Sequence, residues 1–508
     1  MPRYYIQDFG TATSHPDWRA VALFLQDNFR ITRHLTLNAG IRWDIQTFLV
    51  PGLESNPLYA PSGKLPSDTN NFSPRLGFAY SVGERNPLVI RGGAGRFYSL
   101  VPAIYASQVQ TDNGLRQSDL FLDLMKPADA AIFPAYPNPL VSCPSGTTNC
   151  VVPANLSRHL TTTVSAFSPN FQTPYVDQAS LTIERELGQK IIATASYLYV
   201  HGEHLIRSLD ANLPPPAIVD YPVYSDNGSV FLGQYLPVES FATWQTKKTV
   251  ACPHPPCLND IQRPIPQLDT INSFESEASS IYDGLTLSLK RQMNHGLFLR
   301  IAYTFAKAID DGQDALVVGR PGNVQNAYAV NLERGLSVTD QRHRLVASGI
   351  VQPRQLETGY GWLNRIANGW QVSSVLTYGS GRPVNATIAG DANQDGNTYN
   401  DRLPGYRRNA FIGPDYFTTD LRLTRNLRIG EQLTLQLLAE SFNTFNRTNA
   451  QVTVSDDGFL NAAGQFVAYS TKVGSKVYPG QFLKSSDFLN PNNAYAPRQV
   501  QFSVRATF

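Results

Sequence analysis

A run of oxygen-bearing side chains between residues 391 and 401 is the most specific chemical pattern in the chain. Asp391, Asn393 and Asp395 stand at alternate positions, and Gly396 follows at the sixth position. This spacing copies the first half of an EF-hand calcium loop, in which the glycine permits the sharp turn that brings the oxygens together. The pattern predicts a calcium site made by these three side chains, with Asp401 as a further carboxylate.

The same loop departs from a complete calcium loop in its second half. The twelfth position holds Arg402 in place of a bidentate glutamate, and Asp401 stands one residue before it. No flanking helices are predicted. A turn whose Asp and Asn side chains bond to the loop's own backbone is therefore the alternative. Calcium is the one cofactor that the sequence suggests, and no cofactor is required.

Four cysteines form two close pairs, Cys143 with Cys150 and Cys252 with Cys257. Both pairs lie in Pro-rich polar stretches, which predicts two local disulfides in an oxidising compartment. A zinc site built from all four cysteines is the alternative. Neither pair has the Cys-x-x-Cys spacing that is typical of zinc ligands.

No arrangement of residues in the sequence indicates catalysis. Scattered histidines such as His201, His204, His295 and His343 have no cysteine or serine placed beside them as a nucleophile. We therefore predict a protein that binds its substrate and is not an enzyme.

Alternating strands are the elements that must position these residues. The stretch LTLNAGIRWDIQ at 35–46 alternates apolar and polar residues throughout, as a strand with one apolar and one wet face does. Similar stretches pair into six hairpins across mostly short links. The hairpins are predicted at 19–29 with 35–46, 72–82 with 87–99, 176–187 with 191–200, 282–292 with 297–308, 342–351 with 369–379, and 419–429 with 432–442.

A thirteenth strand ends the chain. From Gln499 to Phe508 polar and apolar residues alternate strictly. Its length matches the roughly 9–11 residues that a tilted strand needs to cross the hydrocarbon layer of a bilayer. The strand resembles the terminal strand of bacterial outer-membrane barrels, whose final aromatic residue is recognised by the barrel-assembly machinery. The resemblance gives Phe508 the role of an assembly signal.

The links between strands alternate between short and long. The links between hairpins are rich in Pro, Gly, Asn, Asp and Ser, and they span 47–70, 100–175, 202–281, 309–341, 380–418 and 443–497. Loops of this length are uncommon in compact soluble domains. The alternation is typical of an outer-membrane barrel with short periplasmic turns and long outer loops. Both cysteine pairs and the 391–401 loop then lie outside the cell.

Charged residues from Asp340 to Arg344 open a strand, and we expect them to face the lumen.

The composition excludes two classes of protein. No run of about eighteen apolar residues is present, which excludes helical membrane spans. The mean hydropathy of −0.24 remains compatible with a barrel, whose lipid-facing and lumen-facing residues alternate. A net charge of +2 gives no electrostatic case for binding nucleic acid. A secreted all-β carbohydrate-binding protein is the soluble alternative, and it should bury its apolar faces between two sheets.

Several stretches, taken in order along almost the whole chain, resemble the Oar-like TonB-dependent receptors of the acidobacterial type. They include LTLNAGIRWD, NFSPRLGFAY, YDGLTLSLKRQMNHGLFLRIAYTFAKAIDD, GLSVTDQRHRLVASGIV, NGWQVSSVLTYGSGRPV, DANQDGNTYNDRLPG and the terminal RQVQFSVRATF. Each stretch is weakly specific alone, and their order and spacing carry the resemblance.

The resemblance implies an all-β protein, an antiparallel transmembrane β-barrel of about 22 strands around a plug. Residues 1–508 are expected to be its C-terminal part, with about thirteen strands, and the plug and N-terminal extension are expected upstream. The implied function is TonB-dependent uptake of an unidentified extracellular substrate across the cell outer membrane. The alternative is a passive pore or an export and surface-assembly channel. The implied partners are outer-membrane lipid, the TonB complex acting through the plug, and the barrel-assembly machinery.

Overall fold

The computed structural model of the chain describes most of its residues. The described ranges are 4–10, 13–83, 87–123, 127–135, 138–141, 156, 160–188, 190–224, 229–241, 263–312, 324–397, 400–429, 433–452, 456–461, 464–468, 471–473, 476–478 and 493–507. No helix in these ranges is long and apolar enough to cross a membrane.

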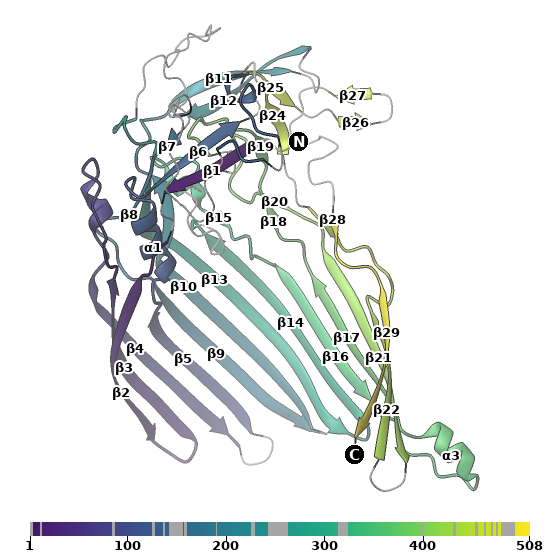
Figure 1. Ribbon diagram of the computed structural model, residues 1–508. Coiled ribbons are helices and arrows are strands. Elements are labelled where there is room, and N and C mark those ends of the chain that lie inside the picture. Colours follow the sequence, from purple (N-terminus) through teal and green to yellow (C-terminus); the bar gives the residue numbers. More distant parts are fainter. Residues whose placement is uncertain are drawn as a thin grey trace.

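A curved antiparallel sheet forms the main body of the molecule (Figure 1). Its main path runs through thirteen described strands in sequence order, each antiparallel to the next, and we call this path the barrel wall. The strands are β2 Asp17–Arg30, β3 Leu35–Leu49, β4 Asp68–Val82, β5 Leu88–Tyr98, β9 Tyr175–Gly188, β10 Ile191–Asp210, β13 Thr270–Asn294, β14 Leu297–Asp310, β16 His343–Val351, β17 Trp370–Gly379, β21 Tyr416–Ile429, β22 Leu433–Phe442 and β29 Gln499–Thr507. All six predicted hairpins and the terminal strand are confirmed.

The short links explain why these hairpins form. Between β13 and β14 the two link residues, His295 and Gly296, have φ angles of 52° and 75°. Left-handed conformation at both central residues defines the tight turn whose twist matches a hairpin. A Cβ at Gly296 would lie 1.9 Å from the backbone oxygen of Gln352, so the second position requires glycine.

Two strands extend far beyond the bounds that the sequence pattern predicted. Strand β10 continues to Asp210 and β13 begins at Thr270, whereas the pattern placed residues 202–281 in a loop. The register of the pair shifts near Gly202, Leu205 and Arg207, and then continues to Asp210 opposite Asn272. These bulges break the strict alternation on which the prediction depended. The extension carries the wall into the region of the long links.

The two faces of the wall differ in chemistry. Residues directly opposite on neighbouring strands share a face. Leu285 lies opposite Phe305, and their side chains are 41% and 47% exposed in the isolated chain. On the other face Thr286 lies opposite Thr304, and the two hydroxyls are 2.9 Å apart. The apolar outer face is suited to lipid, and the polar face lines the lumen.

The wall is open at its two ends in the described ranges. Strands β2 and β29 end the path and are not paired with each other there. Every residue of β2 and β29 is exposed. Each of these two strands therefore has one backbone edge without a neighbouring strand in the described structure.

The long links gather at one end of the wall, where part of them folds into a separate sheet (Figure 1). We call this sheet the outer cap; it runs in the order β12-β11-β25-β24-β19. Its strands are β11 Ala217–Tyr224, β12 Phe231–Ser240, β19 Thr387–Ala389, β24 Asp456–Leu460 and β25 Phe466–Ala468. Two of its pairings, β11 with β25 and β19 with β24, are parallel and join separate links.

An apolar core holds the outer cap together. Val223, Ile388, Leu403 and Phe466 are each at most 2% exposed and belong to one cluster. Because these residues come from three different links, the cap fixes the links relative to one another. The long links are thus folded structure in these parts, which the sequence pattern did not predict.

Smaller elements complete the described chain. They are β1 Tyr4–Gly10, β6 Gln117–Asp123, β7 Leu160–Thr161, β8 Thr163–Phe167, β15 Gly335–Leu336, β18 Pro383–Val384, β20 Phe411–Ile412, β23 Ala450–Gln451, β26 Thr471–Val473, β27 Lys476–Tyr478, β28 Asn493–Ala494, α1 Ala103–Thr111, α2 Pro127–Ala130, α3 Gly361–Ala367, and the 3-10 turns η1 Ala60–Gly63 and η3 Val330–Glu333. Helix α3 lies at the end of the wall opposite the outer cap (Figure 1).

Candidate functional site

Residues 391–401, which we call the Asx loop, follow cap strand β19 after one residue, Gly390. Asp391 accepts hydrogen bonds from the backbone N–H groups of Asp395 (3.1 Å) and Gly396 (3.2 Å). The Oδ1 atom of Asp395 accepts one from the N–H of Asn397 at 2.6 Å. Gly396 has a φ of 96°, a conformation that L side chains rarely adopt. The sharp turn predicted from the sequence is therefore present.

Asp401 returns to the start of the loop. Its Oδ1 atom accepts hydrogen bonds from the N–H groups of Ala392 (2.9 Å) and Asn393 (2.8 Å). Its Oδ2 atom is buried and has no hydrogen-bond partner in the described structure. Only 2% of Asp401 is exposed, so the carboxylate lies in the interior of the molecule.

Side chains and backbone of the Asx loop contact two other long links. Asn393 Nδ2 donates to the backbone oxygen of Gln325 at 3.1 Å, and Phe241 N donates to Asn393 O at 2.7 Å. The hydroxyl of Tyr221 donates to Ala392 O at 2.9 Å. The loop is therefore a junction between links that are far apart in the sequence.

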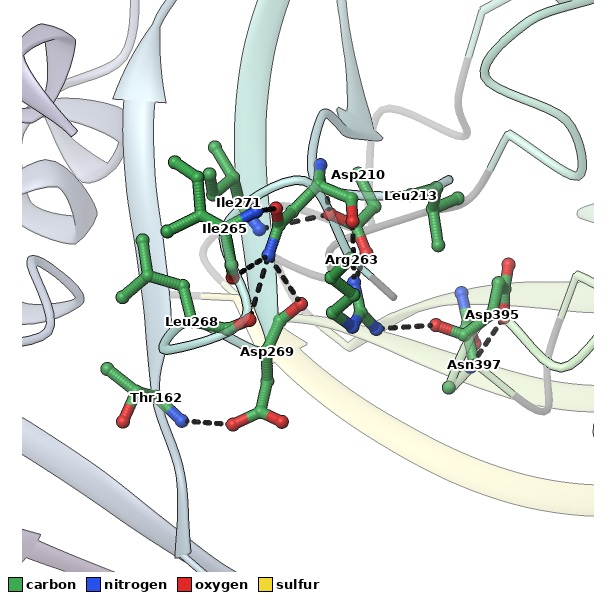
Figure 2. A network of polar contacts seen from close by, with 12 residues as sticks. Thr162, Asp210, Leu213, Arg263, Ile265, Leu268, Asp269, Ile271, Asp395 and Asn397 are labelled. Atoms are coloured by element: carbon green, nitrogen blue, oxygen red, sulfur yellow. Dashed lines mark hydrogen bonds and ion pairs between the residues drawn. The ribbon is translucent and has the colours of Figure 1, made fainter. Parts of the chain in front are cut away.

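Arg263 connects the Asx loop to the barrel wall (Figure 2). Its Nη1 atom is 2.7 Å from Asp210 Oδ2 at the end of β10, and its Nη2 atom donates to Asp395 O at 3.3 Å. The other oxygen of Asp210 accepts from the N–H groups of Asn212 (2.9 Å) and Ile271 (3.0 Å). Arg263 was not predicted from the sequence. Its partners Asp210 and Asp395 are 53 and 132 residues away in the chain, so no local pattern connects them.

Arg402 forms a buried ion pair. Its guanidinium donates two hydrogen bonds to Glu333, at 2.7 and 2.9 Å, and the two side chains are 9% and 7% exposed. Nearby Arg408 pairs with Asp310 at the end of β14 and donates to Glu333 O at 3.3 Å. The residue that interrupts the calcium pattern thus serves to join two links.

The predicted calcium ligands are brought together in one loop, but backbone groups already engage much of their bonding capacity. In the described part of the chain, no group of three or more His, Cys, Asp or Glu side chains is arranged to hold a metal ion. Burial raises the pKa of Asp395 and of Asp401 well above the usual aspartate range, and the nearby charge of Asp391 raises both further. Calcium stays a prediction for Asp391, Asn393, Asp395 and Asp401.

The other predicted site residues fall into two groups. Cys143, Cys150, Cys252, Cys257 and Phe508 lie outside the described residues. Of the histidines, His343 lies 2.8 Å from the hydroxyl of Tyr303, and His201 lies 2.8 Å from Glu203. The segment from Asp340 to Arg344 was expected to face the lumen. Arg344 does so, because it lies opposite Thr304, whereas His343 lies opposite Phe305 on the outer face. The expectation that all these charged residues face the lumen is therefore only partly correct.

A wall with a lipid-suited face, a polar lumen face and folded outer links defines an outer-membrane β-barrel protein. The profile of the family described as "Outer membrane beta barrel domain" matches residues 1–407 and 404–501. The chain belongs to this family, and its location is the outer membrane. The soluble, secreted alternative is therefore wrong.

Solved structures give matches of low identity. The outer membrane transporter YddB from Escherichia coli has 12% identity and a TM-score of 0.46, over 85% of this chain and 42% of that chain. A mutant of the ferric enterobactin receptor PfeA from Pseudomonas aeruginosa has 14% identity and a TM-score of 0.45, over 96% and 45%. The FrpB iron transporter from Neisseria meningitidis has 10% identity and a TM-score of 0.44, over 86% and 42%.

The chain spans less than half the length of each of these proteins. A comparison with curated proteins finds no match.

Removing the Arg402 side chain should destabilise the outer cap. The substitution Arg402→Ala leaves the Glu333 carboxylate buried without its cation, which costs about 3–5 kcal/mol. We expect hydrogen exchange in residues 386–403 to rise steeply. Arg447→Ala is the matched control, because its pair with Asp415 (2.9 Å) is 38% and 42% exposed and should contribute below about 1 kcal/mol. Equal exchange in the two variants would contradict the role of the buried pair.

The stability of the outer cap should fall as the pH rises. The folded pKa of Asp401 and Asp395 lies above the unfolded value of about 3.9, so the folded cap binds more protons than the unfolded chain. The loss should begin above about pH 4 and continue through the raised pKa values. The measurement is the temperature at which the cap becomes sensitive to protease. It is made at a series of pH values from acid to alkaline, with a chelator present to remove metal ions. Asp401→Asn keeps the acceptor oxygen and should make the stability of the cap depend less on pH. If the stability of the unmutated cap rises with pH, the prediction is wrong.

Calcium should bind the Asx loop with an affinity of roughly 10⁻⁴–10⁻³ M, as oxygen-ligand sites outside cells do. The Oδ2 atom of Asp401 is available to the ion, while Asp391 and Asp395 must exchange backbone contacts for it. Calorimetry on the intact barrel should detect the binding, and Asp395→Ala should weaken it at least several-fold. Asp415→Ala, outside the loop, is the control. If no calcium-dependent heat disappears in the Asp395 variant, the loop is a structural turn only.

Proposed function

We propose that this chain is the C-terminal barrel part of a TonB-dependent receptor that takes up an extracellular substrate across the outer membrane. The observation that carries the proposal is the outer cap, which long links build at one end of a wall with a polar lumen face. A passive pore needs an open mouth, whereas a receptor needs a shaped and stable outer surface. The motif resemblance to Oar-like receptors supports the same function.

The chemistry of the described residues supports binding and gating. Four links meet around the Asx loop and its ion pairs, so the four are joined in one connected unit. Arg263 and Arg408 tie this junction to the ends of β10 and β14. Substrate captured at the cap would therefore act on the wall directly.

The proposed partners follow from this function. Outer-membrane lipid contacts the apolar face of the wall, and the barrel-assembly machinery recognises the terminal strand that ends at Phe508. The TonB complex acts through a plug segment outside this chain. The substrate is an extracellular molecule whose identity the motifs leave open.

Uptake can be tested without knowing the substrate. Spent medium from the native bacterium, from a strain lacking this gene, and from a strain lacking TonB is compared by mass spectrometry. We expect one or more medium components to be depleted only when both this protein and TonB are present. A point variant that destabilises the cap, Arg402→Ala, should slow the depletion.

The rival functions give different results in the same experiment. A passive pore would deplete components equally with and without TonB. An export or surface-assembly channel would make components or surface proteins accumulate outside the parent strain and not outside the deletion strain. Either result would replace the proposal of TonB-dependent uptake.

A further inference from the structure

A pocket of about 580 Å³ lies at the outer ends of β16, β17 and β21. It is separate from the Asx loop and is built from five segments of the chain. The side chains that matter for its chemistry are Gln341, Arg344, Arg382, Tyr416, Gln451 and Tyr495.

The floor of the pocket is set by strand register. Arg344 lies directly opposite Gly379, which in turn lies directly opposite Tyr416, so the three share the lumen face. Gly379 leaves a gap between the two large side chains, and the amide of Gln341 occupies it. The Nε2 atom of Gln341 would lie 2.1 Å from a Cβ at Gly379, and it donates to Ser380 O at 3.1 Å. A guanidinium, an amide and a phenol thus converge across three strands.

The backbone around Arg382 is rigid. Its carbonyl oxygen accepts a hydrogen bond from Gly413 N at 2.9 Å, and the next two residues form the β18–β20 ladder. A Cβ at Gly381 would lie 1.7 Å from Gly413 O, so the close approach of the two segments needs glycine there. The fold therefore fixes the backbone position of Arg382, from which its exposed side chain lines the pocket.

The pocket carries positive charge without a counter-charge in the described structure. Arg344 and Arg382 are both exposed, and neither forms an ion pair in the described ranges. The acidic residues nearby are engaged: Asp415 pairs with Arg447 at 2.9 Å, and Asp340 with Arg342 at 3.8 Å. Two arginines that line one pocket without a carboxylate give it a positive potential, which favours an anion there.

Aromatic surface lies beside the charge. The rings of Tyr416 and Tyr495 are in edge contact, with centroids 5.0 Å apart, and Tyr495 is 51% exposed. The backbone N–H of Tyr495 donates to Asn449 O at 2.9 Å, which fixes the segment that carries it. A ring attached to an anionic group could pack on this pair.

We propose that this pocket binds the anionic group of the transported substrate, a carboxylate or phosphate joined to a ring. The guanidiniums of Arg344 and Arg382 receive the anion by charge-assisted hydrogen bonds, Gln341 donates a further bond, and Tyr416 with Tyr495 contacts the ring. This inference rests on the proposed receptor function and deepens it by naming the substrate class. The sequence placed Arg344 among the residues expected to face the lumen, but it did not single out Arg382. The convergence of the two depends on register and on the β18–β20 contact.

Calorimetry on the purified full-length receptor in detergent tests the pocket with citrate, phenyl phosphate and neutral glucose as probes. We expect citrate, phenyl phosphate or both to bind with a salt-sensitive affinity, and glucose not to bind. Arg344→Gln and Arg382→Gln should each weaken binding about tenfold, the loss of one charge-assisted contact. Tyr495→Ala should weaken phenyl phosphate more than citrate. If only citrate binds, the anionic group of the substrate is a carboxylate. If only phenyl phosphate binds, that group is a phosphate.

Arg300→Gln is the matched control, because Arg300 is exposed on the lumen face opposite Ser348 but lies outside the pocket. It should leave binding unchanged. No heat from either anion, or an equal loss in the Arg300 and Arg344 variants, would overturn the pocket assignment. The assay measures binding without TonB and without transport. A negative result would therefore contradict the pocket assignment but not the proposed TonB-dependent uptake. Failure of TonB-dependent uptake with intact anion binding would instead overturn the proposed function.

Discussion

Backbone hydrogen bonding is the constraint on which the rest of this structure depends. A strand inside hydrocarbon cannot leave its N–H and C=O groups to water, so each must pair with a neighbouring strand. The thirteen strands of the wall satisfy this by pairing in sequence order. Once that order is fixed, the alternation of side chains puts apolar residues toward lipid and polar residues toward the lumen. The long links lie beyond the hydrocarbon layer, where part of them folds into the outer cap.

The outer cap solves a different physical problem from the wall. Its core combines a cluster of fully buried apolar residues, such as Val223 and Phe466, with buried ions that are held in pairs. Apolar packing alone holds surfaces together without fixing their register, whereas the Arg402–Glu333 and Arg263–Asp210 pairs tolerate only one arrangement. The cap is thereby both stable and specific in shape. Its attachment to the ends of β10 and β14 makes it continuous with the wall.

The sequence predicts the wall well because the signals for it are local. Strict alternation, mostly with short links such as His295 and Gly296, determines each hairpin from residues that are near one another in the chain. The cap escaped prediction because its pairings join distant segments, such as Val223 with Phe466. The Asx loop contains one feature of each kind. The turn at Gly396 could be predicted from the spacing of nearby residues. The pairing of Arg402 with Glu333 could not, because the two are 69 residues apart. The bulges near Gly202 likewise hid the extensions of β10 and β13.

The parallel contact between β11 and β25 has a consequence for how the protein reaches its final form. Residues 223 and 466 are separated by several membrane-crossing hairpins, so this contact cannot form during synthesis of either segment. The contact can therefore form only once both links lie at the outer end of the wall. Closing so long a loop is entropically costly, which makes it a late and slow event. A conformational epitope spanning these two strands would appear on the cell surface only after wall assembly, marking mature molecules among those still being built.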